Sequence, residues 1–216
     1  MAKATEVVTG KVRLSYVNLF QPRVDQSGKS KYSVTLLIPK SDTETLKKIN
    51  AAIQEAANIG LNGAWKGTMP PQLPTPIHDG DGVRESGEPF GDECKGHWVM
   101  TASANENHPP EVVDQQLNKV LDATAVYSGC YARVFLNFYP YGGGNTTYKK
   151  GVGVGLGPVQ KIADGEVLGG SAPKASSVFD VVADIGEEVQ GVANPFAGGG
   201  VTAINSNINP ITGLPM

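Results

Sequence analysis

The chain has 216 residues with a formal net charge of −3, and 40% of its residues are apolar and 18% charged. This length suits one domain with long loops or one domain with a tail, and no segment is long and apolar enough to predict a membrane span. The N-terminus lacks the apolar run of a secretory signal, so we expect a cytoplasmic protein whose cysteines, Cys94 and Cys130, are free thiols.

The first two predicted elements are strands with a basic outer face. Residues 6–20 alternate in polarity, as do residues 31–38, and we expect the two segments to form a hairpin. The apolar face of the first strand consists of Val8, Val12, Leu14 and Tyr16. The opposite face, the connection and the second strand contribute the basic residues Lys11, Arg13, Lys29 and Lys31.

A helix and a long loop region follow the hairpin. Ser41 and Glu44 have the spacing of a capping box, which predicts a helix from about residue 42 to residue 58. Residues 61–95 are rich in glycine, proline and acidic residues. We therefore expect loops there, with a short strand near residues 75–78.

The remaining segments complete a mainly β chain. Residues 97–104 predict a third main strand, residues 109–123 a short strand followed by a helical turn, and residues 151–162 a glycine-rich closing strand. Alternate glycines in that last strand permit the close approach of another part of the chain. With the strand described next, these elements match those of an OB-fold, a five-stranded Greek-key barrel, which we place in residues 1–168. We expect residues 169–216 to form a Gly-rich, partly acidic C-terminal tail.

The strand predicted at residues 129–141 gives the sharpest functional signal. Its expected core face consists of Cys130, Ala132, Val134, Leu136 and Phe138. Its other face interleaves aromatic and polar side chains, namely Tyr131, Arg133, Phe135, Asn137 and Tyr139. Side chains on one face of a strand repeat about every 7 Å, which suits the stacking of successive bases of an extended nucleic acid. An alternative is that both faces are buried, by a helix or by a second subunit.

The charge distribution supports a ligand that bears phosphates. Residues 1–66 and 126–161 carry charges of +5 and +4, whereas the two blocks that alternate with them carry −7 and −5. Such segregated basic segments can bind phosphate even though the whole chain is acidic. The predicted nucleic-acid contacts are Lys11, Arg13, Lys29, Lys31, Tyr131, Arg133, Phe135, Tyr139, Tyr141, Tyr148, Lys149 and Lys150.

Catalytic and metal-binding motifs are weak in this sequence. Asp79 and Asp81 have a spacing that can hold Ca²⁺ or Mg²⁺, but the rest of an EF-hand is missing, so we predict a solvated loop without a metal or cofactor. The three histidines belong to no hydrolase or deaminase motif, and we predict that the protein is not an enzyme. The alternatives to nucleic-acid binding are a structural or assembly protein with a Gly-rich β-domain and, more remotely, a metal-dependent nuclease that uses the acidic loop.

Two segments, YSGCYARVFLNFYPYGG and KGVGVGLGPVQKIADGE, resemble a family of phage single-stranded DNA-binding proteins over roughly residues 5–168. That family is related in fold to the replication single-stranded DNA-binding proteins of short-tailed coliphages. The resemblance implies an OB-fold, sequence-independent binding of single-stranded DNA in phage replication or recombination in the host cytoplasm, and a homodimer. It also implies contacts with phage replication or recombination proteins through an acidic tail, but here the last 28 residues carry no charge. We consider instead that the acidic segment around Phe179 mimics DNA and competes for its groove.

Overall fold

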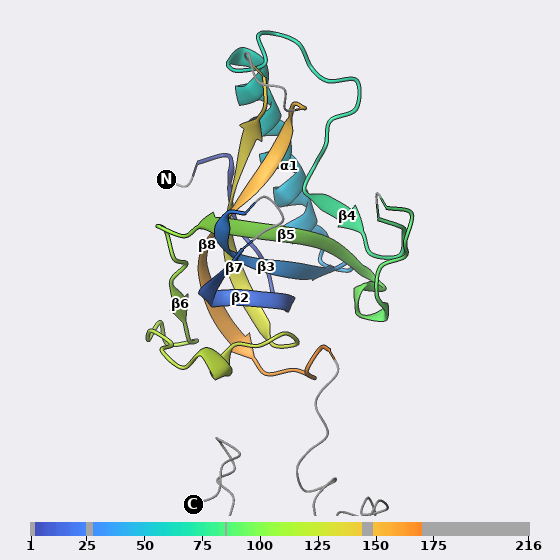
Figure 1. The fold of residues 1–216 in the computed structure, drawn as a ribbon. Helices are drawn as coiled ribbons and strands as arrows, with labels where there is room; N and C mark the ends of the chain where they lie inside the picture. The colour runs from blue at the N-terminus through green and yellow to red at the C-terminus, as the bar shows by residue number, and fades with distance from the viewer. Residues whose placement is uncertain (1–2, 25–27, 85, 144–148, 170–216) are drawn as a thin grey trace, which may run out of the picture. The chain divides into compact units, whose positions relative to one another are not determined.

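The computed structural model describes residues 3–24, 28–84, 86–143 and 149–169 (Figure 1). The strands are β1 (Glu6–Val8), β2 (Val12–Val24), β3 (Ser30–Pro39), β4 (Ile77–Asp79), β5 (His97–Asn105), β6 (Val112–Val113), β7 (Tyr131–Tyr141) and β8 (Gly151–Ala163). The helices are α1 (Thr43–Asn62) and two short 3-10 turns, η1 (Asp92–Cys94) and η2 (Ala123–Ala125). No helix in the described ranges is long and apolar enough to cross a membrane. The fold is mainly β with one main helix, as predicted.

Five strands close into a ring. The order β7-β2-β3-β5-β8 is completed by the pairing of β7 with β8, so each of these strands has a neighbour on both sides. All pairings in the ring are antiparallel except that of β5 with β8, which is parallel at Ser103 and Gly155. This is an OB-like fold, with β3 and β5 as the second and third strands of the ring in chain order.

The core lies inside the ring and follows the predicted alternation. The five residues of the expected core face, four on β7 and Cys130 directly before it, are at most 1% exposed. On β3, Val34, Leu36 and Ile38 point inward, so Ser33, Thr35 and Leu37 belong to the outer face. These two faces of each strand decide which side chains a ligand can reach.

Helix α1 covers part of this core. It packs against β7 and β1, and Ile49, Ile53 and Ala56 are buried in the same cluster as the inner faces of the strands. The predicted capping box is wrong: Asp42 is the N-cap, and its carboxylate accepts a hydrogen bond from the Thr45 backbone N–H at 3.0 Å. The helix also ends four residues later than expected, at Asn62.

The first predicted strand is two strands. The break falls at residues 9–11, and β1 pairs with the middle of β7 while β2 pairs with its start. Gly10 lies at the break because a Cβ there would collide with the Asp42 carboxylate. The break and the positive φ of Tyr16, 48°, put Val8 and Tyr16 on the surface, contrary to their predicted place on the apolar face.

The loop predicted at residues 61–95 contains an unexpected core residue. Trp65 is 1% exposed, and its indole Nε1–H donates to the Tyr141 carbonyl at 3.0 Å. The predicted short strand is β4, and the strand predicted within residues 109–123 is β6. Cys94 and Cys130 are both buried and free, as expected.

Candidate nucleic-acid interface

Four aromatic side chains lie along the outer face of β7. We call Tyr131, Phe135, Tyr139 and Tyr141 the ring stripe. Tyr139 is 44% exposed and Tyr141 39% exposed, whereas Phe138, the residue before Tyr139, is buried in the core. The alternative in which the chain itself buries both faces of this strand is therefore wrong for the C-terminal end of β7, where Tyr139 and Tyr141 are exposed.

The glycines of β8 explain how these rings lie. A Cβ on Gly153 would be 2.8 Å from Tyr139 Cζ, and one on Gly157 would be 2.6 Å from Phe135 Cδ1. Tyr141 covers Gly151 in the same way, across the directly paired strand. The alternate glycines thus admit the close approach predicted from the sequence, and what approaches is the aromatic side chains of the neighbouring strand. Each of these three rings thus lies over a glycine of β8, where no side chain stands beneath it.

The first ring of the stripe has a different environment. The Lys11 ammonium lies 4.4 Å from the centre of the Tyr131 ring, a cation–π contact. Arg13 beside it donates to the Gly129 carbonyl at 3.3 Å and to the Glu166 carbonyl at 2.7 Å. These bonds hold the chain after β8 across the start of β7, so Arg13 has a structural role that the sequence did not reveal.

The outer faces of β3 and β5 form a second surface, which contains a hollow of about 380 Å³. We call it the β3–β5 hollow. Its lining residues are Ser15, Tyr16, Thr35, Leu37, Arg84, Phe90, Glu93, Cys94, Val99 and Thr101. None of these was predicted as a contact, because residues 83–94 have no periodicity and Tyr16 was assigned to the core. Tyr16, Phe90 and Arg84 supply the rings and the cation that a nucleic acid needs.

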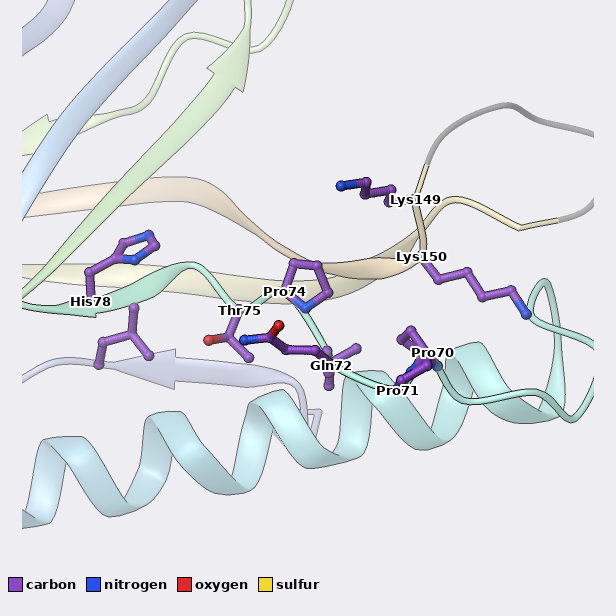
Figure 2. A pocket seen from close by; sticks show the side chains of 10 residues that line it. Pro70, Pro71, Gln72, Pro74, Thr75, His78, Lys149 and Lys150 are labelled. Carbon is purple, nitrogen blue, oxygen red and sulfur yellow. The ribbon is translucent and has the colours of Figure 1, made fainter. Parts of the chain in front are cut away.

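A larger pocket of about 840 Å³ lies beside the β7–β8 connection, with His78 at one end and Lys150 at the other (Figure 2). The Lys150 ammonium donates to the Trp65 and Thr68 carbonyls, at 3.0 and 2.9 Å, whereas exposed Lys149 lies at the rim. The His78 and Phe90 rings are 6.4 Å apart. Because Phe90 lines the β3–β5 hollow, the two pockets adjoin one another.

The remaining predicted contacts are distributed over both surfaces. Lys31 lies on β3 opposite Asn105, on the face that holds the β3–β5 hollow, and Lys29 precedes that strand. Arg133 is exposed on β7, and its Nε donates to the Thr9 carbonyl at 3.4 Å. Tyr148 lies outside the described residues. The structure therefore divides the predicted set between the ring stripe and the β3–β5 side of the ring.

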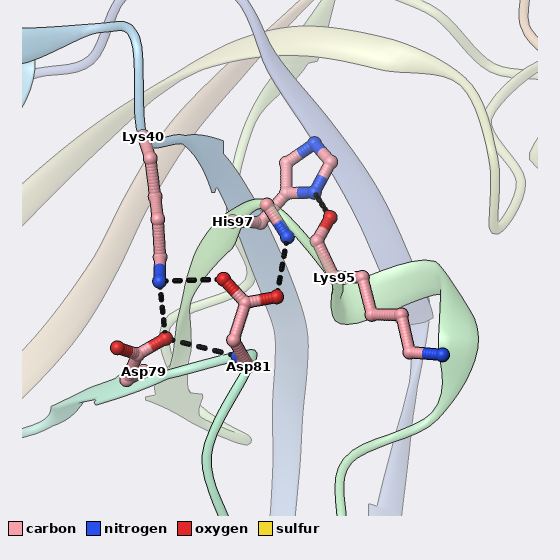
Figure 3. A network of polar contacts seen from close by, with 6 residues as sticks. Lys40, Asp79, Asp81, Lys95 and His97 are labelled. Atoms are coloured by element: carbon pink, nitrogen blue, oxygen red, sulfur yellow. Dashed lines mark hydrogen bonds and ion pairs between the residues drawn. The ribbon is translucent and has the colours of Figure 1, made fainter.

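The acidic loop is held by an ion-pair network (Figure 3). The Lys40 ammonium lies 2.5 Å from a carboxylate oxygen of Asp79 and 2.7 Å from one of Asp81. The hydrogen bonds from Lys40 lower the pKa of both carboxyls, and the Gly96 N–H further lowers the pKa of Asp81. The described part of the chain has no cluster of metal-ligating side chains. The Asp79–Asp81 pair thus ties the end of β4 and the loop after it to Lys40, which directly follows β3.

A closed OB-like ring whose outer wall presents aromatic rings, hydroxyl groups and lysines defines a protein of the oligonucleotide-binding OB class. Residues 5–190 match the family described as "Enterobacter phage Enc34, ssDNA-binding protein". The chain belongs to this family. The match extends past the tail boundary predicted at residue 168, and that boundary stays a prediction.

Similar proteins come from several phages. Protein p50 of Acyrthosiphon pisum secondary endosymbiont phage 1 is 28% identical over 184 residues, which cover 82% of this chain and 94% of p50. The structure of the single-stranded DNA-binding protein from bacteriophage Enc34 in complex with ssDNA is 29% identical, with a TM-score of 0.63, and covers 77% of this chain and 91% of that one. The single-stranded DNA-binding protein gp2.5 of bacteriophage T7 is 16% identical with a TM-score of 0.52, over 84% of this chain and 98% of that one, and supports the fold alone.

Proposed function

We propose that this protein binds single-stranded DNA without sequence preference and without chemistry, in phage DNA replication or recombination. The observation that supports this most is membership of a family described as ssDNA-binding, together with an outer wall suited to bases and phosphates. The Enc34 protein, a similar structure, was solved in complex with ssDNA. The place of action that follows is the host cytoplasm, where phage DNA is copied.

The proposed path of the strand crosses the outer faces of β3 and β5. OB-folds bind oligonucleotides on the face of their second and third strands and with the loops between strands 1–2 and 4–5. In this chain that surface begins near Lys29 and Lys31, crosses the β3–β5 hollow, passes His78 and reaches Lys149 at the β7–β8 connection. The ring stripe on β7 extends this binding surface past β8. Strand β8 connects the two parts, because its Gly155 pairs with Ser103 of β5.

The chemistry of the wall favours single strands. Stacking of a base on an aromatic ring contributes about 1–3 kcal/mol and needs a free base face, which a duplex hides. Cationic side chains attract phosphates without distinguishing sequences. Those of this wall are Lys11, Lys29, Lys31, Arg84, Arg133, Lys149 and Lys150. Arg13 is a further predicted phosphate contact and Tyr131 a predicted stacking ring; within the chain, Arg13 donates to the Glu166 carbonyl and Tyr131 contacts the Lys11 ammonium.

The interaction partners that we propose are single-stranded DNA, a second copy of the chain, and phage replication or recombination proteins. The exposed rings of Tyr139 and Tyr141 are available to DNA or to a second copy. We assign these two side chains to DNA, because the ring stripe lies near β5, whose outer face the proposed path of the DNA crosses. A homodimer would then pair through another surface.

Binding of fluorescent oligonucleotides, measured across a salt series with and without Mg²⁺, tests this function. We expect tight binding of single strands, much weaker binding of duplex, and no cleavage with Mg²⁺. Log affinity should fall with log salt at about −0.7 per contacted phosphate. Indifference to oligonucleotides together with assembly into large particles would point to a structural protein instead, and Mg²⁺-dependent cleavage would point to a nuclease.

A further inference from the structure

We propose that successive copies of this chain associate head to tail along a DNA strand, by insertion of Leu117 of one copy into the pocket between His78 and Lys150 of the next. This inference rests on the proposed function and names the surface by which a second copy is recognised. It starts from a leucine in a backbone conformation that favours glycine.

Residues 111–122 form a small hairpin, which we call the leucine hairpin. The Asp114 N–H donates to the Asn118 carbonyl at 2.9 Å, and the Asp114 carboxylate accepts from the N–H groups of Gln116 and Asn118, both at 2.8 Å. The three-residue loop so closed ends on Leu117, whose φ is 67°. In hairpin loops of this length the last position is left-handed and is usually glycine, because a side chain there strains the backbone.

The packing of the described residues does not account for a leucine at this position. The Leu117 side chain is 71% exposed, and Leu121 on the same hairpin is 80% exposed. The hairpin itself is held in place, because Gln160 Nε2 donates to the Asp114 carbonyl at 3.3 Å and Gln115 Nε2 donates to the Ile162 carbonyl. Strained positions cluster at functional sites. A fixed support that presents an exposed leucine in a strained conformation suits contact with a partner.

The charge of the leucine hairpin argues against DNA as that partner. It carries three acidic residues, Glu111, Asp114 and Asp122, and one basic residue, Lys119, hence a net charge of −2. The hydrogen bonds from Asn118 lower the pKa of the Asp114 carboxyl, which therefore stays ionised at neutral pH. Such a surface repels phosphates and is complementary to an apolar pocket with a basic rim.

The pocket beside the β7–β8 connection has this complementary chemistry. Its apolar lining consists of Leu73 and Ile77, which pack against the core, and three prolines. The described lining residues include two lysines and no acidic residue. Asp79, which follows the pocket in sequence, is paired with Lys40. The volume of about 840 Å³ leaves room for a leucine side chain from another molecule.

The leucine hairpin and the pocket lie at opposite ends of β8. Val112 pairs with Val159, whereas the Val152 N–H donates to the Pro74 carbonyl at 3.0 Å, so the two features are roughly 23 Å apart along the strand. In Figure 1 the connection after β6 and the connection from α1 to β4 likewise lie at opposite ends of the fold. Complementary surfaces at opposite ends form a contact that repeats into an open chain of copies.

The proposed path of the DNA joins the same two ends. It begins near Lys31, which pairs with Asn105 at the end of β5, shortly before the leucine hairpin in the chain. It reaches Lys149 at the rim of the pocket. Neighbouring copies on one strand would therefore bring the leucine hairpin of one against the pocket of the other.

The variant Leu117→Gly tests the contact without a risk to folding. It should weaken binding to long polythymidylate by about 10- to 100-fold and leave unchanged the affinity for an oligothymidylate that accommodates one copy. Its unfolding temperature should equal or exceed that of the wild type, because glycine relieves the strain. Val8→Thr changes another exposed apolar side chain, on β1, and should affect neither affinity.

Crosslinking of cysteine variants identifies the two surfaces. A short bismaleimide should join Leu117→Cys to Pro71→Cys in a mixture of the two variants on polythymidylate, whereas the native cysteines are buried. Neither variant alone should form a covalent pair, and neither should a mixture of Leu117→Cys with Val8→Cys. A pair formed by Leu117→Cys alone would show that two leucine hairpins meet each other, which would overturn the head-to-tail arrangement.

The outcomes distinguish this inference from the proposed function. If the wild type binds the short oligothymidylate but gains nothing on polythymidylate, or if Leu117→Gly keeps that gain, the inference is wrong and the DNA-binding function stands. A loss of the gain without a crosslink to Pro71→Cys would refute the pocket as the partner of Leu117. If the wild type binds no oligonucleotide under any salt condition, both the function and the inference are wrong.

Discussion

A single methyl group on β8 should move the Tyr139 ring on β7. In Gly153→Ala the new Cβ would lie 2.8 Å from Tyr139 Cζ and 3.0 Å from Cε2 and Oη, all closer than ordinary van der Waals contact. Tyr139 is 44% exposed, so its ring can swing away from the strand into solvent. Neither Gly153 nor Gly155 has a positive φ, so the backbone tolerates alanine at both positions.

The expected result is a loss of affinity without a loss of stability. Replacing glycine with alanine at an unstrained position stabilises a protein by about 0.4–1 kcal/mol, which offsets the cost of moving the ring. If Tyr139 stacks on a base, displacing it should cost up to about 1–3 kcal/mol of binding free energy, a 5- to 150-fold weaker Kd. Fluorescence anisotropy with a labelled oligothymidylate measures the affinity, and thermal unfolding measures the stability.

Gly155→Ala is the matched control on the same strand. Its Cβ would lie 3.5 Å from the Asn137 carbonyl oxygen and 3.9 Å from Tyr139 Cε1, which are ordinary contacts, so affinity should stay at the wild-type level. In a Tyr139→Ala background, Gly153→Ala should have no further effect on binding. Wild-type affinity in Gly153→Ala, or an equal loss in the Tyr139→Ala background, would refute the argument that the glycine acts through the ring.

Three further predictions follow from the contacts of individual lysines and from the tail. Lys149→Gln should reduce the slope of log affinity against log salt by about 0.7 and leave the unfolding temperature unchanged. Lys150→Gln should also lower the unfolding temperature, because Lys150 donates to two carbonyls. Equal unfolding temperatures for the two variants would contradict this. Lys40→Met should lower the unfolding temperature slightly at pH 7. The difference should begin to shrink below about pH 4 and vanish only at still lower pH, because Lys40 lowers the pKa of both carboxyls, which therefore stay ionised in the folded protein below their ordinary range. It should also shrink at pH values above the ordinary lysine pKa of about 10.5, because the hydrogen bonds to the two carboxyls raise the pKa of Lys40 and the ion pairs are lost only when it loses its proton. A pH-independent difference in thermal melts would show that the ion pairs are not the cause. Deletion of residues 169–216 should increase the affinity for single strands at low salt if the acidic segment competes with DNA, and unchanged affinity in the same anisotropy assay would rule that competition out.

Much of this molecule follows from local patterns in the chain. Period-two alternation located the main strands and gave the buried face of β7 correctly, because the inner and outer faces of a strand in a closed ring differ in exposure at every second residue. The alternate glycines of β8 likewise predicted the close approach of another part of the chain, because glycine has no side chain to hold it away. A short break in a strand is harder to predict, and the misassigned faces of Val8 and Tyr16 arose from one such break and one bulge.

Only the tertiary structure decided how the surfaces are arranged. The β3–β5 hollow combines residues from β2, β3, β5 and an irregular loop, whose positions in space no periodicity encodes. The interactions that restrain Arg13 and Lys150 are bonds to carbonyls far along the chain, and backbone acceptors look the same in every sequence. The amino-acid sequence by itself thus determined which faces of the strands avoid water, since that depends on side chains alone. Ring closure and loop packing determined which exposed groups lie together, since that depends on pairing between distant segments.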